Sequence, residues 1–361
     1  MKIHVIGTRG IPDIQGGVEK HCEYIYPMLA EKNEILIYRR VPFLDANNKS
    51  ISDYKGVRLL DLPTVKVKGI EALLHSFIAV CHSLIYKPDI VHVHNIGPSF
   101  FTPLLKLRGV KVVMTYHSPN YEHNKWGPFS KLFLRICEKI SFTFSDYLIF
   151  VNPFQRNKFN KTIQHKSTYI PNGIVSERKC DKFILQKWSL EKNKYILAVG
   201  RITEEKGFDL LVAAYKMLKD SGFKLVIVGG ADHNSSYAKK LLENANENII
   251  FTGAVSSLEL NAFYESTRLF VLSSRNEGFP LVLLEALSFN VDVLVSDIPA
   301  TQIVHLNESS KFKSNSVESL KDALNNKLSS SINTFNYNID EYKWEIVAKK
   351  TSDVYDRVIS L

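Results

Sequence analysis

Two cations follow a short apolar segment in the second half of the chain. Residues 195–200 have the composition of a buried strand, and Arg201 and Lys206 flank the turn behind it, close to a predicted helix start. A forked guanidinium and a compact ammonium suit the two charges of a diphosphate. Fixed cations of this kind help most when a leaving diphosphate gains negative charge in the transition state. The alternative is pairing of these cations with the carboxylates at 204–209.

A carboxylate inside an apolar helix is the second chemical signal. Glu285 lies in the predicted helix 280–289, whose other residues are mostly apolar, and an unpaired charge there would be costly. A bidentate contact with ribose hydroxyls would satisfy it, whereas a backbone group or a lysine is the structural alternative. Seven residues separate Glu277 from Glu285, which corresponds to about 10 Å if the segment is mostly helical. That distance matches the span from a donor sugar to its ribose.

The start of the same helix offers backbone donors. Pro280 is placed as a first-turn residue, so the amides near Phe279–Val282 are expected to be open to an anion at the helix N-terminus. Such amides, together with the helix dipole, favour an anion. The sequence therefore predicts sugar or phosphate contacts at this helix start.

A glycine pair opens the first helix of the chain. Gly16 and Gly17 follow the segment 7–12 behind the first predicted strand, with Arg9 close by. Glycines at a helix start let the backbone approach an anion, but a tight strand-to-helix turn explains them about as well. The spacing is not that of a dinucleotide-binding loop, so no such cofactor is expected.

Three histidines lie on or behind strands of the first half. His92 and His94 alternate on one strand and share a face. Without a third ligand at suitable spacing they are interpreted as hydrogen-bonded structural residues, and no metal site is predicted. His117 stands at the C-terminal tip of another strand, where it could bond a sugar hydroxyl or stabilise developing charge. The alternative is an ordinary loop histidine.

Short apolar runs that alternate with helical patterns predict an α/β protein with two doubly wound Rossmann-like domains and a cleft beyond the strand ends. The Pro-Asn-Gly break at 171–173 favours a boundary there. We expect an acceptor-side domain over 1–171 and a donor-binding domain over 172–340. A terminal helix at about 341–361 is expected to pack back on the first domain. The strands are predicted at 2–7, 34–38, 90–94, 111–116, 147–151, 195–200, 224–228, 249–252, 269–273 and 292–296. Each of the last five is expected to be followed by a helix, at 207–220, 235–246, 257–266, 280–289 and 299–306.

Charge is unevenly distributed along the chain. Residues 1–172 carry 23 Lys and Arg against 13 Asp and Glu, whereas residues 173–361 carry 23 against 24. The basic half suits an anionic membrane surface or a phosphate-bearing acceptor, with a solvated basic face as the alternative. Because no nucleic-acid-binding motif accompanies the charge, nucleic acid is not an expected partner.

The cellular location is predicted from what the sequence carries. Four scattered cysteines without a CxxC pair fit a reducing compartment. The chain opens on a strand pattern rather than a basic leader, and the apolar run 69–86 is too polar to span a bilayer comfortably. We therefore expect a cytoplasmic protein, with a peripheral position on the cytoplasmic face of the inner membrane as an extension of this hypothesis.

Taken together, these motifs make the chain resemble the retaining, GT-B-fold glycosyltransferases of family 4, in particular the bacterial surface-polysaccharide branch that includes rhamnosyltransferases. The resemblance covers nearly the whole length. It is carried by Gly7–Pro12 with Gly16–Glu19, Val91–His94, Tyr116–His117, Pro171–Ile174, Gly200–Gly207 and Glu277–Ala286. The last two motifs are highly specific together.

The resemblance implies a role for each site residue. Arg201 and Lys206 would hold the donor diphosphate, with the backbone at Gly16 and Gly17 closing over it. Glu277 would bind hydroxyls of the donor sugar. Members of the family usually need no metal, so neither a metal nor another cofactor is expected.

Further roles follow from the same resemblance. The backbone at Gly278–Leu281 would meet sugar and phosphate, and Glu285 would bind the ribose. The base would rest near Val255, and His117 would lie by the reacting face of the sugar. Two segments depart from the family pattern: Val175 replaces a common Asp in the linker, and 118–127 differs from the rhamnosyltransferase branch.

The predicted function is transfer of a hexose or deoxyhexose from a UDP- or dTDP-sugar to a growing surface polysaccharide or lipid-linked oligosaccharide, with retention. The predicted route is front-face attack assisted by the leaving phosphate. A sugar-nucleotide 2-epimerase on the same fold is the enzymatic alternative, and it would need no acceptor. A non-catalytic sugar-nucleotide-binding protein at the membrane is the other alternative, and it would release no nucleotide.

Overall fold

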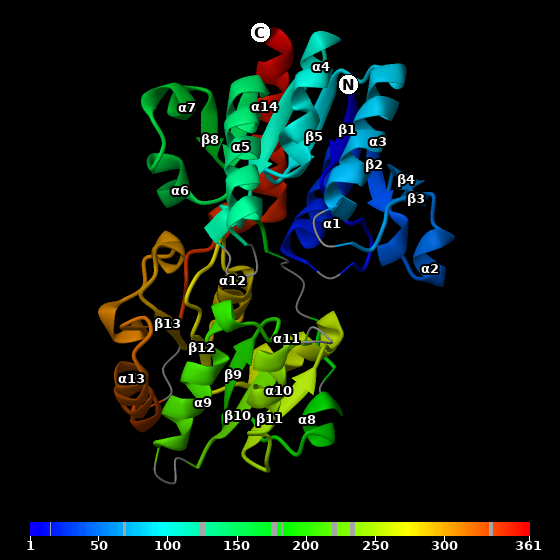
Figure 1. The fold of residues 1–361 in the computed structure, drawn as a ribbon. Helices are drawn as coiled ribbons and strands as arrows, with labels where there is room; N and C mark the ends of the chain where they lie inside the picture. The colour runs from blue at the N-terminus through cyan, green and yellow to red at the C-terminus, as the bar shows by residue number, and fades with distance from the viewer. Residues whose placement is uncertain are drawn as a thin grey trace. The chain divides into compact units, whose positions relative to one another are not determined.

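The computed structural model divides into two compact units, Met1–Gly173 with Glu341–Leu361, and Ile174–Asp340 (Figure 1). We call them the N unit and the C unit. The structure describes residues 1–14, 16–67, 70–122, 127–174, 179–181, 183–218, 222–231, 235–331 and 335–361. The linker position Val175 and part of the departing segment, 123–126, lie outside these residues.

The N unit is built on an eight-stranded sheet in the order β3-β4-β2-β1-β5-β6-β7-β8. All neighbours are parallel except β3 and β4. The strands are β1 (Lys2–Ile6), β2 (Glu34–Arg40), β3 (Asp53–Tyr54), β4 (Val57–Leu62), β5 (Ile90–His94), β6 (Lys111–Tyr116), β7 (Tyr147–Phe150) and β8 (Ser167–Tyr169).

Helices cover both faces of this sheet, as parallel strands require. On one face, Val91 and Val93 of β5 join the apolar core formed with α3 (Ile70–Tyr86) and α4 (Thr102–Leu107). The alternate residues of β5, His92 and His94, point to the other face. There α1 (Gly17–Ala30) packs against the terminal helix α14 (Trp344–Ser360). The remaining helical segments are η1 (Val41–Phe43), α2 (Ala46–Lys49), η2 (Pro98–Phe101), η3 (Asn120–Glu122), α5 (Pro128–Phe144), α6 (Pro153–Asn157), α7 (Lys161–His165) and η7 (Asp340–Tyr342).

The C unit has a six-stranded, wholly parallel sheet in the order β11-β10-β9-β12-β13-β14. Its strands are β9 (Tyr195–Val199), β10 (Lys224–Val228), β11 (Ile249–Gly253), β12 (Leu269–Leu272), β13 (Val293–Ser296) and β14 (Lys311–Phe312). Its helical segments are α8 (Phe183–Lys187), η4 (Glu204–Lys206), α9 (Phe208–Lys216), α10 (Ser236–Leu242), α11 (Ser257–Ser266), α12 (Leu281–Ser288), η5 (Pro299–Ile303), η6 (Glu308–Ser310) and α13 (Val317–Ser329).

Strand order reverses between β9 and β12, which are neighbours although the chain between them visits the opposite edge of the sheet. The carboxyl ends of strands at such a switch point form the usual ligand crevice of open α/β sheets. The same reversal occurs between β1 and β5 in the N unit. The two loops that carry Lys206 and Glu277 therefore leave adjacent strand ends.

The predicted α/β class with two Rossmann-like halves is confirmed. The prediction of a helix at 299–306 is wrong, since only a 3-10 segment, η5, forms there. The Thr301 hydroxyl donates back to the carbonyls of Ser296 and Ile298, at 2.8 Å each, and so favours a tight turn over an α-helix. Within the described residues, no helix combines the length and apolarity needed to cross a membrane.

Trp344 ties the terminal helix to the N unit. Its indole stacks on Tyr24, with ring centroids 5.5 Å apart, and meets the edge of His21 at 5.6 Å. The backbone of Gly173 lies directly against the indole, because a Cβ at this glycine would fall 2.3 Å from the ring. The Pro-Asn-Gly segment is thus a contact surface for Trp344 as well as a break.

We predict that Trp344→Ala lowers the free energy of unfolding by about 3–5 kcal/mol, because it leaves a buried cavity among Tyr24, His21 and Gly173. Denaturant unfolding followed by circular dichroism measures the loss. Ile359→Ala on the exposed side of α14 is the control and should change stability by about 0.5 kcal/mol or less. Equal effects of the two substitutions would contradict this account.

Candidate active site

Lys206 and Glu277 form a salt bridge in the C unit. Lys206 Nζ lies 2.6 Å from Glu277 Oε1, and the Ser274 hydroxyl donates to the same oxygen at 2.7 Å. The Glu277 side chain is 11% exposed and that of Lys206 is 21% exposed. The structure thus brings together two residues that the sequence placed 71 positions apart. Within the described residues, Lys206 forms its ion pair with Glu277 rather than with one of the carboxylates at 204–209.

Arg275 holds the loop of Glu277 against the turn of Lys206. Its guanidinium donates to both carboxylate oxygens of Asp209, at 2.8 and 2.6 Å, and to the carbonyl of Glu204 at 2.7 Å. Its backbone amide bonds the carbonyl of Glu205 at 2.7 Å. The bidentate pair lowers the pKa of Asp209 despite partial burial, which raises it. Two loops on neighbouring strands are therefore fixed to each other by the contacts of Arg275 as well as by the Lys206–Glu277 pair.

Gly207 makes this approach of the loops possible. Its φ is +63°, and a Cβ there would lie 2.1 Å from the carbonyl oxygen of Ser273. Only glycine fits such a close backbone approach. The Ser273 hydroxyl also donates to the carbonyl of Lys206 at 2.9 Å. The backbone around Lys206 is consequently positioned by the end of β12.

Arg201 follows β9 and has an exposed side chain. The neighbouring Ile202 amide donates to the carbonyl of Gly230 at 2.9 Å, so the backbone behind β9 is anchored to the loop behind β10. Among the described residues, no hydrogen bond or ion pair engages the Arg201 guanidinium. A fixed backbone with an uncommitted guanidinium is the state expected of a residue that receives an anionic ligand.

Pro280 is the N-cap residue of α12, not a first-turn residue, which corrects the sequence prediction. Its ψ is 78°, and the helix begins at Leu281. The Leu281 amide donates to the Phe279 carbonyl at 3.0 Å, so it is not open to an anion as expected. The reason is that the chain turns sharply at Phe279 and Pro280 before it enters the helix. Gly278 and Phe279 are half-buried in this turn.

Glu285 lies half-buried in α12 and has a protein partner. The Tyr264 hydroxyl donates to Glu285 Oε2 at 3.0 Å, and Tyr264 stacks on Phe289 with ring centroids 5.7 Å apart. Burial, and then the neighbouring carboxylate, raise the pKa of Tyr264 well above its usual range, so it remains a donor. A tyrosine therefore fills the place for which the sequence suggested a backbone group or a lysine. Val255 is half-buried behind β11.

In the N unit, His117 ends a buried chain of hydrogen bonds. Its Nε2 lies 2.9 Å from His94 Nδ1, and His94 Nε2 lies 2.6 Å from the Tyr26 hydroxyl. The Tyr26 hydroxyl also lies 3.0 Å from His92 Nδ1, which is 2.6 Å from the Tyr355 hydroxyl of α14. His92 and His94 are thus hydrogen-bonded structural histidines, as the sequence indicated. The chain runs from α14 through α1 and β5 to the tip of β6.

Burial keeps these imidazoles neutral. It lowers the pKa of His92 to about 3, and it holds the pKa values of His94 and His117 well below their usual range, with nearby histidines as the smaller cause. A neutral imidazole carries one N–H, so the polarity of the chain decides the tautomer of His117. The Nδ1 atom of His117 therefore carries either a proton or a lone pair. The direction in which the Tyr26 hydroxyl donates determines which of the two is present.

His21 closes this cluster from the side of α1. Its Nδ1 lies 2.8 Å from Asn172 Oδ1, and its ring meets that of His117 edge-on, with centroids 5.2 Å apart. Burial lowers the pKa of His21 to about 4, although the bond to Asn172 opposes the shift. The Pro-Asn-Gly segment therefore supplies a side-chain acceptor to the same cluster.

The glycine pair opens α1 as the sequence indicated. Gly16 is the N-cap residue of α1. A Cβ at this position would lie 1.9 Å from Glu19 Oε2, so glycine is required here because the Glu19 side chain of the same helix packs against its backbone. The Glu19 carboxylate accepts from the Arg9 amide at 3.0 Å, and the Arg9 guanidinium lies over the Phe43 ring. Gly17 is exposed at the helix start. Packing against Glu19 therefore explains why position 16 is a glycine. The contact of this loop with an anion stays a prediction.

Several residues of the site carry no sequence signal of their own. Tyr264, Ser274 and Arg275 act only through partners that the fold brings near. Tyr26 lies on α1 at helical spacing from other buried residues, a pattern that predicts an ordinary core residue. Within the described residues, no cluster of three or more His, Cys, Asp or Glu side chains has a metal-binding arrangement.

Comparison with known families matches each unit to a glycosyltransferase model. Residues 15–178 match the model of Glycosyltransferase Family 4, and residues 181–343 match that of Glycosyl transferases group 1. The two matches are adjacent and together span most of the chain. This chain is a GT-B glycosyltransferase. Its homologues include enzymes of bacterial surface-polysaccharide synthesis.

Several relatives of known activity are similar over part or most of the chain. Alpha-galactosylglucosyldiacylglycerol synthase of Streptococcus pneumoniae is 26% identical over 78% of this chain and 80% of its own length. The O-antigen chain mannosyltransferase of Salmonella typhimurium is 27% identical over 60% of this chain and 61% of its own. An N-acetylgalactosaminyltransferase of Campylobacter jejuni, which acts on N,N'-diacetylbacillosaminyl-diphospho-undecaprenol, is 33% identical over 44% of each chain.

Solved structures share the fold at low identity. Sucrose-phosphate synthase of Thermosynechococcus elongatus superposes with a TM-score of 0.84 at 19% identity, over 99% of both chains. Anabaena HepE, solved with UDP-glucose, superposes with a TM-score of 0.75 at 14% identity, over 100% of this chain and 98% of its own.

We predict that the N unit loses stability as the pH falls below about 6.5, because its buried histidines resist protonation when folded. Unfolding raises their pKa values to about 6.5, so below that pH the unfolded chain binds more protons than the folded one. At about pH 5, each such histidine costs about 2 kcal/mol of stability relative to neutral pH.

Scanning calorimetry between about pH 7.5 and about pH 5 measures this loss. His21→Gln should flatten the pH dependence, whereas His165→Gln, at an exposed position of α7, should leave it unchanged. A transition temperature that stays constant across this range would contradict the assignment of buried neutral histidines.

Proposed function

We propose that this glycosyltransferase transfers a hexose or deoxyhexose from a UDP- or dTDP-sugar with retention, to a growing surface polysaccharide or lipid-linked oligosaccharide. The observation that carries the proposal is the Lys206–Glu277 salt bridge at the switch point of the parallel sheet, with Arg201 in the same segment behind β9 as Lys206. Such a position at the strand ends of an open α/β sheet suits an anionic ligand, which supports the proposal.

Arg201 and Lys206 supply the charge that a leaving diphosphate needs. The uncommitted Arg201 guanidinium would bind the phosphates as a fork, and the Lys206 ammonium would swing from Glu277 to a phosphate oxygen. Bond cleavage moves negative charge onto that oxygen, so both cations bind the transition state better than the ground state. We propose that these two side chains take the place of a metal ion and that the enzyme needs no cofactor.

Glu277 and Glu285 would bind hydroxyls of the donor. When Lys206 moves to the diphosphate, the Glu277 oxygen that it leaves can accept from a hydroxyl of the sugar, while Ser274 keeps the carboxylate oriented. Glu285, held by Tyr264 through Oε2, would accept from the ribose hydroxyls. Val255 would flank the base. Binding of the nucleotide sugar would thus replace the Lys206 ammonium at Glu277 with a sugar hydroxyl. At Glu285 it would add ribose hydroxyls to the hydrogen bond from Tyr264.

Retention is proposed to follow a front-face route. With the donor bound, the same Glu277 oxygen would accept from Ser274 and from a sugar hydroxyl, and this role disfavours its attack as a nucleophile. The leaving phosphate oxygen would then accept the proton of the incoming hydroxyl on the same face. Neutral His117 would bond a sugar hydroxyl near the reacting carbon, in the tautomer set by His94 and Tyr26.

The acceptor is proposed from the relatives and the charge. The Campylobacter relative is named for a diphospho-undecaprenol substrate, and the pneumococcal relative for a diacylglycerol product. The first 172 residues of this chain are the basic part. A cytoplasmic enzyme placed peripherally on an anionic membrane would meet such an acceptor directly.

A screen of nucleotide sugars tests the function. Release of nucleoside diphosphate is measured for each donor, with and without polyprenyl-diphosphate-linked saccharide, and the anomeric configuration of the product is read by NMR. Release that needs the acceptor supports transfer. Conversion of the donor without acceptor would support the epimerase alternative, and binding without any release would support a non-catalytic protein.

We predict that Lys206→Ala and Glu277→Ala each reduce turnover about 10²- to 10³-fold, because each removes charge or orientation that acts in the transition state. The exposed positions Lys239→Ala and Glu243→Ala are matched controls of the same residue types and should keep wild-type turnover. Near wild-type turnover in either site variant, with a circular dichroism spectrum like that of the parent, would remove that residue from the site.

A further inference from the structure

Large apolar side chains lie exposed on one helical layer of the N unit. Of the 18 large hydrophobic residues that are exposed in the described structure, 12 fall between Val65 and Phe144. On α5 they recur at helical spacing: Phe129 is 89% exposed, Leu132 59% and Ile136 47%. One such residue is unremarkable, but a concentration in one stretch of a surface marks an interaction site.

The neighbouring helix α3 continues this pattern. Ile70, Leu74 and Phe77 lie exposed at positions i, i+4 and i+7. The residues of α3 that face the sheet, Ala79 and Val80 among them, are apolar as well. This helix is therefore hydrophobic on its inner and outer sides, whereas a helix at a water-exposed surface carries a polar outer face.

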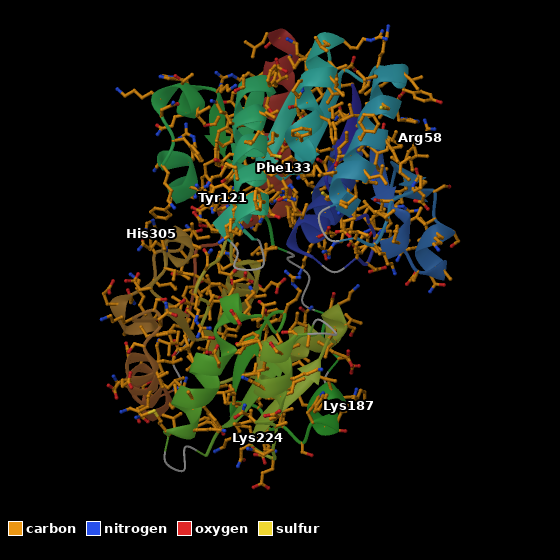
Figure 2. All side chains as sticks on the ribbon, in the orientation of Figure 1. Arg58, Tyr121, Phe133, Lys187, Lys224 and His305 are labelled. Atoms are coloured by element: carbon orange, nitrogen blue, oxygen red, sulfur yellow. The ribbon has the colours of Figure 1, made fainter. Side chains whose placement is uncertain are left out.

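The two helices belong to one continuous layer. Both pack against η2, and α4 lies between them (Figure 1). Aromatic rings bridge the layer: Phe77 of α3 meets Phe101 at 5.4 Å, Phe101 meets Phe100 at 5.1 Å, and Phe100 meets Phe133 of α5 at 5.3 Å. Phe133 is labelled on this layer in Figure 2. We name the exposed side of α3, α4 and α5 the α3–α5 face.

The charges of this face have one sign. Arg135 and Lys139 are exposed on α5, and Arg108 is exposed just behind α4. The carboxylates of the same helices are engaged within the unit: Glu71 of α3 pairs with buried Arg40, and Glu138 of α5 accepts from the Tyr116 hydroxyl at 2.6 Å. The outward charges on these three helices are therefore cationic.

We propose that the α3–α5 face docks the enzyme on an anionic lipid bilayer. Phe129, Leu132 and the apolar stripe of α3 enter the boundary between headgroups and acyl chains, while Arg135 and Lys139 contact anionic headgroups. The inference rests on the proposed function, because a lipid-linked acceptor gives the enzyme a reason to be at a membrane, and it assigns that contact to particular helices.

Charge favours a bilayer over a second copy of the chain. A two-fold pairing through this face would set Arg135 and Lys139 of one copy against the same residues of the other, and like charges in contact are unfavourable. An anionic bilayer instead supplies both the apolar phase and the opposite charge. The exposed arrangement of apolar stripes flanked by cations fits that partner.

Vesicle co-sedimentation of the full chain tests the proposal. Vesicles of phosphatidylcholine with about 30% phosphatidylglycerol are compared with pure phosphatidylcholine vesicles at low and high salt. We expect binding to the anionic vesicles to be about tenfold stronger than to the neutral ones and to weaken with salt. Equal binding to both kinds of vesicle, or binding to neither, would overturn the proposal.

Variants locate the contact. Phe129→Ser with Leu132→Ser and Ile136→Ser should abolish most of the vesicle binding, and Arg135→Gln with Lys139→Gln should remove its salt dependence. Phe183→Ser with Leu242→Ser and Leu258→Ser replaces exposed apolar residues of the C unit and is the matched control, with binding retained. Wild-type vesicle binding by the α5 variants would place any membrane contact elsewhere and overturn the assignment.

Turnover separates this proposal from the proposed function. The α5 variants should release nucleoside diphosphate at the wild-type rate with a short-chain, water-soluble acceptor, and should lose activity only with acceptor embedded in anionic vesicles. Gel filtration with light scattering identifies a self-association that the α5 substitutions abolish, and that result would make the face a subunit interface and overturn the lipid assignment. Absence of turnover with any donor would instead reject the proposed function, while vesicle binding would still be measured.

Discussion

The contact between Lys206 and Glu277 depends on two loops that the chain makes far apart and the sheet brings together. Each loop leaves the carboxyl end of a parallel strand, and β9 and β12 are neighbours only because the strand order reverses between them. The approach is then fixed by backbone, with the Ser273 carbonyl against Gly207, and by the bidentate contact of Arg275 with Asp209. In the proposed donor site, such an ion pair would keep both side chains oriented until a ligand binds.

The N unit holds buried polar side chains against its parallel sheet, and these side chains are uncharged. His92 and His94 face the helix side of β5, where an apolar residue would be the simpler choice, and Tyr26 and Tyr355 reach them from two helices. Because burial disfavours the protonated form, the imidazoles stay neutral and can both donate and accept. The network therefore links α14, at the end of the chain, to His117 at the tip of β6.

The sequence indicated the architecture well because apolar runs in parallel sheets are short, β-branched and regularly separated by helices. The ends of β5, β6 and β10 agree with the prediction to the residue, and the other predicted strands differ from it by one or two residues. The edge strands β3, β8 and β14, and β4 next to β3, had no such signal, since they are short or partly exposed. The segment 299–303 was misread because a helical pattern cannot reveal that Thr301 bonds back to its own turn.

The candidate site could be anticipated in its residue types but not in its pairings. Arg201, Lys206, Glu277 and Glu285 stand out because charges follow strands or interrupt an apolar helix. That Lys206 bonds Glu277 and that Tyr264 bonds Glu285 are tertiary facts, which spacing along the chain does not encode. The reading of Pro280 as a first-turn residue failed for a local reason, since proline fixes φ but not ψ, and ψ here is not helical.

These pairings change how the unliganded site should be understood. The apolar helix around Glu285 predicts that its carboxylate needs either a ligand or a protein partner, and Tyr264 supplies a protein donor without any ligand. Likewise the Glu277 oxygen bonded by Lys206 is stabilised without a sugar. In the proposed mechanism, a donor replaces the ammonium at Glu277 with sugar hydroxyls while its diphosphate takes the ammonium. A molecule with only one of these parts gains less, because it breaks the Lys206–Glu277 pair without satisfying both partners.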